Sequence, residues 1–185
     1  MDEDSDILPR YYVYNFNGSD VVAAKQTEHY SKFGALYNWE AAKKSPPEGW
    51  RLPTESDWIE LENYVVNHIE GIQSGDYVAT DFLVHTSEGG RNSFGFSGIL
   101  GGCCSEGYFY DRYDYYDPFQ WFLDFEGLGS STSWWSRSVV LWSDYCEDCP
   151  IALTMVQHDA YYMSDDFSLD EREPIVGLSI RCIKD

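Results

Sequence analysis

The sequence predicts an α+β fold, because two helix-like segments come first and short strand-like runs fill the rest of the chain. The 185 residues suit one domain, 1–185, and no internal repeat or linker divides them. Aromatic residues make up 17% of the chain, with 15 Tyr and 7 Trp, which is too high for a disordered protein. We therefore expect a small, mostly antiparallel sheet with long loops.

Residues 1–30 are predicted to contain an N-terminal hairpin. In the stretch 10–24, "RYYVYNFNGSDVVAA", two strand-like runs flank Asn17-Gly18. This dipeptide tolerates the positive φ angles of a tight hairpin turn.

Residues 31–71 are predicted to form two helices. In the first segment, "SKFGALYNWEAAKK" (31–44), Leu36, Trp39 and Ala42 repeat at helical spacing, and Pro46-Pro47 ends the helix.

The second predicted helix starts after Thr54, which can cap it. Asp57 completes a capping box three residues later and places a negative charge at the positive end of the helix dipole. The helix should end near Gly71. Its apolar stripe consists of Trp58, Leu61, Val65 and Ile69.

Residues 72–185 are predicted to be a region of strands and loops that carries the ligand face. Long amphipathic periodicity does not return after Gly71, and glycine, serine and aspartate separate short strand-like runs. These runs are "YVATDFLVHT", "SFGFSGILGG", "TSWWSRSVVLW", "IALTMVQHD" and "VGLSIRCIKD".

The net charge of −20 is spread along the chain, so this is an acidic protein that should repel nucleic acid and anionic membranes. No apolar run approaches the roughly 20 residues of a membrane span, so we expect no membrane insertion. The opening "MDEDSDILPR" shows no basic or apolar region of a signal peptide. From this acidity we expect the protein to lie outside the cell, on the cell surface or on a virion surface.

The stretch 106–126, "EGYFYDRYDYYDPFQWFLDFE", is the strongest candidate for ligand recognition. Ten of its 21 residues are aromatic, and four aspartates are interleaved with them. Rings give contact area at a small entropic cost, and hydroxyls give directional bonds. The stretch 157–173, "QHDAYYMSDDFSLDERE", is similar. The alternative is that these rings fill a core or an oligomer interface.

We expect ligand-binding loops in 106–126 and 142–170. The candidate ligand-binding residues are Tyr108, Tyr110, Tyr113, Tyr115, Tyr116, Trp121, Trp142, Asp144, Tyr161, Tyr162 and Asp165.

Five cysteines leave at least one thiol unpaired within the monomer. Cys146 and Cys149 form a C-x-x-C without the second pair that a zinc site needs, and acidic neighbours would raise their thiol pKa values. A local disulfide or plain thiols are expected there. We predict no catalytic residues, no metal and no cofactor.

Five motif segments carry a family resemblance, and they span Phe33 to Asp185. They read "FGALYNWEAAKK" (33–44), "PPEGWRLPTESDWIEL" (46–61), "FGFSGILGG" (94–102), "GLGSSTSWWSRS" (127–138) and "VGLSIRCIKD" (176–185). In this order the chain resembles the Fibrobacter succinogenes major paralogous domain. The resemblance implies a C-type-lectin-like fold, with two helices flanking a small antiparallel sheet and long irregular loops. That fold is shared with formylglycine-generating enzymes and with variable proteins of diversity-generating retroelements.

One departure from the family pattern concerns Cys182. The family cysteine that precedes "GW" is expected to bridge the one in the final "RC", but Pro46 stands at that position here. We therefore expect Cys182 to be a small buried thiol in the last strand.

Together these observations predict a non-enzymatic ligand-binding module of the adhesin or receptor-binding type. It would recognise a protein or glycan on another surface. The Tyr/Asp-rich composition is compatible with a variable protein of a diversity-generating retroelement. Two alternatives stay open: a cysteine-dependent oxidase of the formylglycine-generating type that uses Cys146 or Cys149, and a structural subunit of a pilus or fibre.

Overall fold

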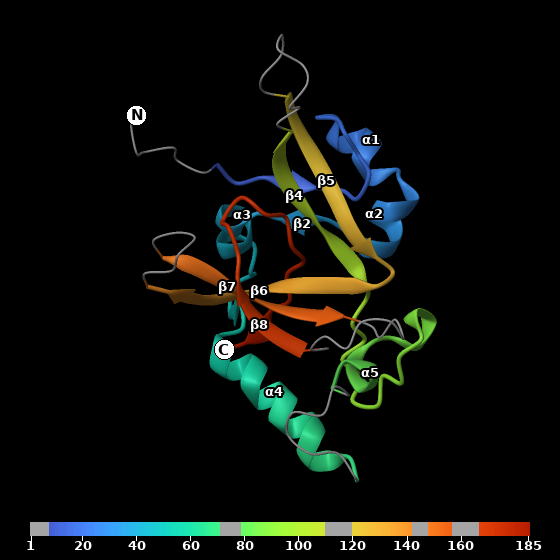
Figure 1. Ribbon diagram of the computed structural model, residues 1–185, viewed down its shortest axis with the longest axis vertical. Helices are drawn as coiled ribbons and strands as arrows, with labels where there is room; N and C mark the ends of the chain where they lie inside the picture. Colours follow the sequence, from blue (N-terminus) through green and yellow to red (C-terminus); the bar gives the residue numbers. More distant parts are fainter. Residues whose placement is uncertain (1–7, 71–78, 110–119, 142–147, 157–166) are drawn as a thin grey trace.

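The computed structural model describes residues 8–70, 79–109, 120–141, 148–156 and 167–185, with the backbone alone at 106–109 and 120–123. The protein is mixed α/β, with helices in the first half and the long strands in the second (Figure 1). The helices are α1 (Val21–Lys25), α2 (Glu28–Phe33), α3 (Trp39–Lys44), α4 (Glu55–His68), α5 (Ala79–Leu83) and the 3-10 helix η1 (Thr86–Glu88). The strands are β1 (Tyr11–Tyr12), β2 (Leu36–Tyr37), β3 (Trp50–Arg51), β4 (Gly101–Phe109), β5 (Gln120–Leu128), β6 (Ser131–Val140), β7 (Cys149–Val156), β8 (Phe167–Glu171) and β9 (Ile183–Lys184).

The main sheet has the strand order β5-β4-β6-β7-β8 and consists of two parts. β4 and β5 form a long antiparallel hairpin, and β6, β7 and β8 form an antiparallel meander. In the described backbone the two parts pair directly at Gly102 and Thr132. Figure 1 shows the hairpin leaving the meander in a different direction, with α1 and α2 beside it.

The C-terminal segment 177–179 fills the gap between these two parts. Gly177 and Cys104 of β4 exchange backbone hydrogen bonds of 2.6 and 2.9 Å. On the other side, the Ser179 N–H donates to the Ser133 carbonyl at 3.0 Å, and the Trp135 N–H donates to the Ser179 carbonyl at 3.1 Å. The end of the chain therefore links the hairpin to the meander.

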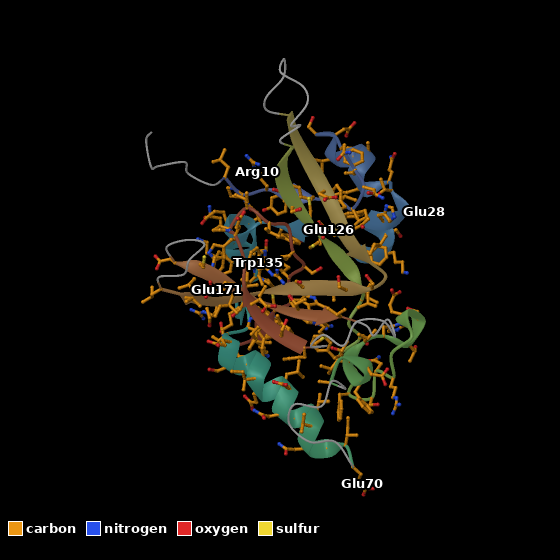
Figure 2. The ribbon with its side chains drawn as sticks, in the orientation of Figure 1. Arg10, Glu28, Glu70, Glu126, Trp135 and Glu171 are labelled. Carbon is orange, nitrogen blue, oxygen red and sulfur yellow. The ribbon has the colours of Figure 1, made fainter. Side chains whose placement is uncertain are left out.

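Two neighbouring tryptophans on β6 bury the two faces of the meander, because successive side chains of a strand point to opposite faces. Trp134 packs in a core with Trp58 of α4 and Phe82 of α5. Trp135, at the centre of the molecule in Figure 2, packs with Trp39 of α3. Helices thus pack on both faces of the meander.

The predicted second helix is confirmed as α4. The Thr54 hydroxyl accepts from the Asp57 N–H at 3.2 Å, and the Asp57 carboxylate accepts from the Thr54 N–H at 2.6 Å, so the capping box is complete. Trp58 and Val65 are buried in the core below the meander. Leu61 and Ile69 pack against the same core.

The prediction of one helix over 31–44 is wrong, because α2 ends at Phe33 and α3 begins at Trp39. Gly34 has a φ of +75° and ends α2. The Asn38 side chain then accepts from the Ala41 N–H at 3.0 Å and caps α3. Of the residues at helical spacing, Trp39 and Ala42 lie in α3, whereas Leu36 lies in β2.

The predicted hairpin in residues 10–24 is also wrong. β1 pairs with β2 in an antiparallel register that matches Tyr12 with Leu36. The stretch 21–25 that was expected to be the second strand is α1. Its cap is Asp20, whose carboxylate accepts from the N–H groups of Val22 and Ala23 at 2.8 and 3.1 Å. A side-chain cap therefore outweighs the β-branched composition of this stretch.

In the region 72–185 the strands expected from "TSWWSRSVVLW" and "IALTMVQHD" are confirmed as β6 and β7. The run "YVATDFLVHT" contains α5 instead of a strand. The expected loops 106–126 and 142–170 are partly strands: β4 and β5 enter the first, and β7 and β8 enter the second. Of the four aspartates in the first stretch, Asp124 lies in β5, opposite Ser105 of β4.

Candidate functional site

Most of the predicted ligand-binding residues lie outside the described residues. These are Tyr110, Tyr113, Tyr115, Tyr116, Trp142, Asp144, Tyr161, Tyr162 and Asp165. Tyr108 lies in β4 and Trp121 in β5, and the backbone register places these two residues opposite each other. The structure therefore brings together one pair of the predicted residues, at the far end of the hairpin.

The second predicted segment, 142–170, is divided by a strand. Val140 pairs with Cys149 at one end of the meander, whereas Met155 pairs with Phe167 at the other. Cys149 and Met155 are six positions apart along β7, which corresponds to about 20 Å. Residues flanking 142–147 and 157–166 are thus held at opposite ends of the sheet.

The base of the β4–β5 hairpin is fixed to the body of the protein. The Tyr14 hydroxyl donates to the Phe125 carbonyl at 3.0 Å, and the two rings are in contact. Burial raises the pKa of the Tyr14 phenol, so it stays a neutral donor. Phe125 also packs against a small core of Tyr12, Leu36 and Cys104.

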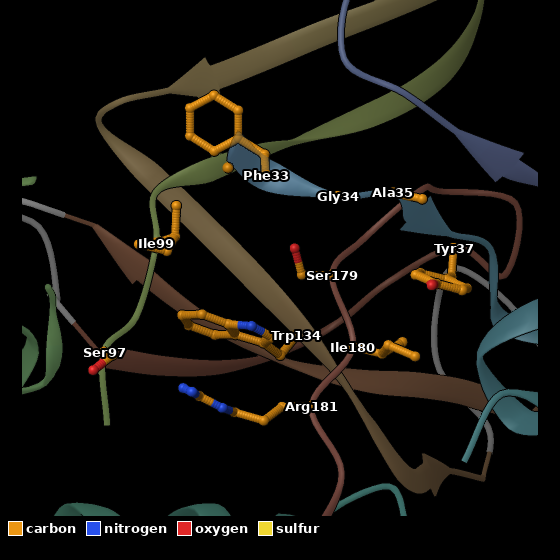
Figure 3. Close-up of a pocket in the computed structure, with 11 residues that line it drawn as sticks. Phe33, Gly34, Ala35, Tyr37, Ser97, Ile99, Trp134, Ser179, Ile180 and Arg181 are labelled. Carbon is orange, nitrogen blue, oxygen red and sulfur yellow. The ribbon is translucent and has the colours of Figure 1, made fainter. Parts of the chain in front are cut away.

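A pocket of about 290 Å³ lies where the hairpin, the meander and the C-terminal segment meet (Figure 3). Its walls come from segments 33–37, 97–101 and 179–181 and from Trp134 of β6. These lining residues all belong to four of the five motif segments. The parts of the sequence that carry the family resemblance thus converge on one concave site.

Arg181 is the charged group of this pocket. Its guanidinium lies 3.9 Å from the centre of the Phe96 ring, and Phe96 in turn contacts Trp134 edge to face. Within the described ranges Arg181 makes no ion pair with a carboxylate. Arg181 is half-buried, and this burial lowers the pKa of its guanidinium.

Two serines, Ser97 and Ser179, line the same pocket as Arg181. Ser97 has a φ of +56°, a strained value for a residue with a side chain. Asn92 holds this conformation: its Oδ1 accepts from the Ser97 N–H at 2.7 Å, and its Nδ2 donates to the Ser97 Oγ at 2.9 Å. The Ser179 hydroxyl has no side-chain hydrogen bond to another described residue. Figure 3 shows Trp134 and Arg181 extending in the same direction, toward Ser97.

A larger cavity of about 540 Å³ lies beside β1, α1 and α2. Tyr11, Phe16 and Tyr30 are among its aromatic walls. The carboxylate of Asp20, which also lines it, is engaged in capping α1. Its residues come mainly from 11–30, outside the motif segments, and its polar groups serve the local fold.

Sequence reasoning missed the pocket around Arg181 because no local pattern marks it. Its residues are up to about 150 positions apart and meet only through the strand order. The available signal was the motif segments themselves, which contain Ser97, Trp134, Ser179 and Arg181.

The cysteines take different roles. Cys149 is buried and disulfide-bonded. Cys182 is a free thiol, as expected, and packs against the Trp39 core, but it is half-buried instead of buried and lies just before β9. Burial raises its pKa. In the part of the chain that the structure describes, no group of three histidine, cysteine, aspartate or glutamate side chains could hold a metal ion.

The fold and the site define a mixed α/β protein with an open sheet and a concave site beside it. The model of the Fibrobacter succinogenes major domain matches residues 3–184, so the chain belongs to that family. Searches among curated proteins and among solved structures found no match. None of the described helices has the length and apolar character that crossing a membrane requires.

Proposed function

We propose that this protein is a non-enzymatic ligand-binding module with a C-type-lectin-like architecture. It would recognise a protein or glycan on another surface, outside the cell or at its surface. The observation that carries the proposal is the β4–β5 hairpin. Its strands extend into the most aromatic stretch of the sequence, and its base is fixed to the body by Tyr14 and by segment 177–179.

A recognition segment gains affinity when a rigid scaffold positions it, because less conformational freedom is lost on binding. The hairpin supplies eight paired residues between Gly101 and Phe109. Tyrosine and tryptophan add large contact areas with only two side-chain torsions each. This arrangement suits a binding surface of the adhesin or receptor-binding type.

The C-type-lectin-like assignment is supported by the placement of two helices. α3 packs on the Trp135 face of the meander and α4 on the Trp134 face. The C-terminal segment returns to the centre of the sheet, and β9 closes against β3. This is the pattern of two helices flanking a small antiparallel sheet that the family resemblance implies.

The alternative of a cysteine-dependent oxidase has less support. Catalysis by cysteine needs an accessible thiolate. The Cys149 side chain is fully buried and its sulfur is in a disulfide. We therefore favour binding over turnover.

The proposal is tested by probing glycan and protein arrays with the purified chain and then with single alanine variants. We expect Tyr113→Ala, Tyr115→Ala or Trp121→Ala to reduce capture of the identified partner at least tenfold, as at interface hot spots. Their melting temperatures should match that of the wild type.

The control is Tyr64→Ala, which removes an exposed tyrosine of α4. It should leave capture unchanged. Equal capture by all four variants would reject the proposed surface, and turnover that Cys146→Ser abolishes would favour the oxidase.

A further inference from the structure

We propose that the pocket around Arg181 is a binding site for the carboxylate group of a small ligand. Arg181 would bind the carboxylate through its guanidinium, and Ser97, toward which Arg181 extends, would donate a hydrogen bond to it. This inference concerns a surface at the base of the hairpin, and it does not depend on the function proposed for the tyrosine-rich segments.

The first argument is the absence of a counter-charge within the described ranges. Arg51, Arg91 and Arg172 each lie within 4 Å of an aspartate oxygen. Arg181 has the face of Phe96 instead. In a chain of net charge −20, acidic side chains are plentiful. A cation kept partly out of water without one of them is costly unless a ligand supplies the negative charge.

The second argument is the state of the Ser97 hydroxyl. Asn92 Nδ2 donates to the Ser97 Oγ, so the Ser97 proton points away from Asn92. The Gly95 carbonyl lies 3.5 Å from this oxygen, which is too long for a strong bond. The Ser179 hydroxyl points toward Phe33 and away from Arg181 (Figure 3), so Ser97 is the serine that can donate to a carboxylate bound by Arg181.

The third argument is the size and lining of the pocket. About 290 Å³ is at the lower limit for small-molecule sites, so the occupant is no larger than an amino acid derivative or one sugar unit. Phe33, Ile99 and Trp134 provide apolar walls for its body. A planar carboxylate on such a body matches the planar guanidinium, which can bind it through two parallel hydrogen bonds.

The experiment measures binding of two matched pairs of probes to the full chain by saturation-transfer NMR and calorimetry. One pair is D-glucuronate and D-glucose, and the other is N-acetylglycinate and N-acetylglycinamide. We expect the carboxylate of at least one pair to bind at least tenfold more tightly than its neutral partner. The pair that binds identifies a sugar acid or an amino acid as the source. Failure of both carboxylates to bind overturns the proposal.

Arg181→Met provides the decisive variant, because it keeps an apolar stem beside Phe96 and removes the charge. Binding should weaken at least tenfold, and the melting temperature should stay equal or rise. Arg137→Met is the matched control: this arginine is exposed and lies outside the pocket, so binding should not change. If Arg181→Met instead lowers the melting temperature by several degrees and leaves binding intact, Arg181 is structural and the proposal fails.

Discussion

At the scale of single residues, Asp57 makes more interactions than the capping box that the sequence predicted. Its carboxylate accepts from the Thr54 N–H and from the Thr54 hydroxyl, both at 2.6 Å. It also accepts two bonds from the Arg51 guanidinium, at 2.6 and 3.1 Å. Arg51 lies in β3, which pairs with β9. One carboxylate therefore caps α4 and fastens it to the strand pair that ends the chain.

Asp57→Asn should lower stability by about 1–2 kcal/mol at pH 7, through the loss of a cap and of charge-assisted bonds. For this chain length that corresponds to about 2–8 °C in melting temperature. The hydrogen bond from Arg51 and those from Thr54 hold the pKa of Asp57 well below its usual range. The stabilisation is therefore fully present above the unfolded carboxyl pKa of about 4. It declines as pH falls below that value and disappears below the folded pKa.

The measurement is thermal unfolding of wild type and Asp57→Asn from pH 7 to pH 2. The difference between the two melting temperatures should narrow below about pH 4. Glu55→Gln is the control in the same helical turn, and it should change stability by only a few tenths of a kcal/mol. A difference that is constant over this pH range would contradict the assigned role of the charge.

At the scale of elements, Gly102 is the joint between the hairpin and the meander. It pairs with Thr132 and has a φ of +66°. A Cβ atom at this position would lie 2.2 Å from the Glu126 carbonyl oxygen and 2.9 Å from the Tyr14 ring. Only glycine allows β4 to leave its partner β5 and reach β6 at this point.

Gly102→Ala should therefore destabilise the protein by about 2–4 kcal/mol, from the left-handed backbone and the steric clash together. Gly101→Ala is the matched control. A Cβ there would meet the nearest atom of Phe33 at 3.7 Å, which is an ordinary contact. It should change stability by less than about 1 kcal/mol. Chemical denaturation of both variants makes the comparison, and equal effects would show that the joint tolerates side chains.

The elements also show what the sequence could predict. α4 was predicted from its first residue because Thr54, Asp57 and the apolar stripe are all local signals. The boundary between α2 and α3 was missed because Leu36, which lies in β2 between them, continues the helical spacing of Trp39 and Ala42. β1 was assigned to the wrong partner, since its pairing with β2 depends on contacts across the sequence that no turn signal encodes.

The two candidate sites, the aromatic stretch and the Arg181 pocket, also differ in how far the sequence predicts them. The aromatic stretch 106–126 is visible in composition alone, although its ends are strands and not loops. The Arg181 pocket forms only where segments 33–37, 97–101 and 179–181 lie beside Trp134 in the folded protein. Composition therefore cannot predict it. The motif segments identified the family, which the match over residues 3–184 confirms. The motif segments contain the residues that line the pocket, but the sequence does not show that these residues lie together.

At the scale of the whole molecule, charge opposes folding. The chain has 32 acidic residues and 12 lysines and arginines, so acidic residues outnumber basic ones by 20. Some are paired, as Glu88 is with Lys32 at 2.9 Å. Figure 2 shows Glu28, Glu70 and Glu171 far apart from one another, so acidic side chains are not confined to one side of the molecule.

Added salt should therefore stabilise this protein at neutral pH. A chain of this length has a radius of gyration of about 16 Å. The Debye length is about 30 Å at 0.01 M ionic strength and about 8 Å at 0.15 M. Raising NaCl between these values removes repulsion across the molecule, whereas close pairs such as Lys32–Glu88 lose little. The melting temperature should rise at pH 7 and stay nearly constant near the sequence pI of about 4.3, where the net charge vanishes. A melting temperature that falls with salt at pH 7 would mean that the surface ion pairs outweigh the repulsion.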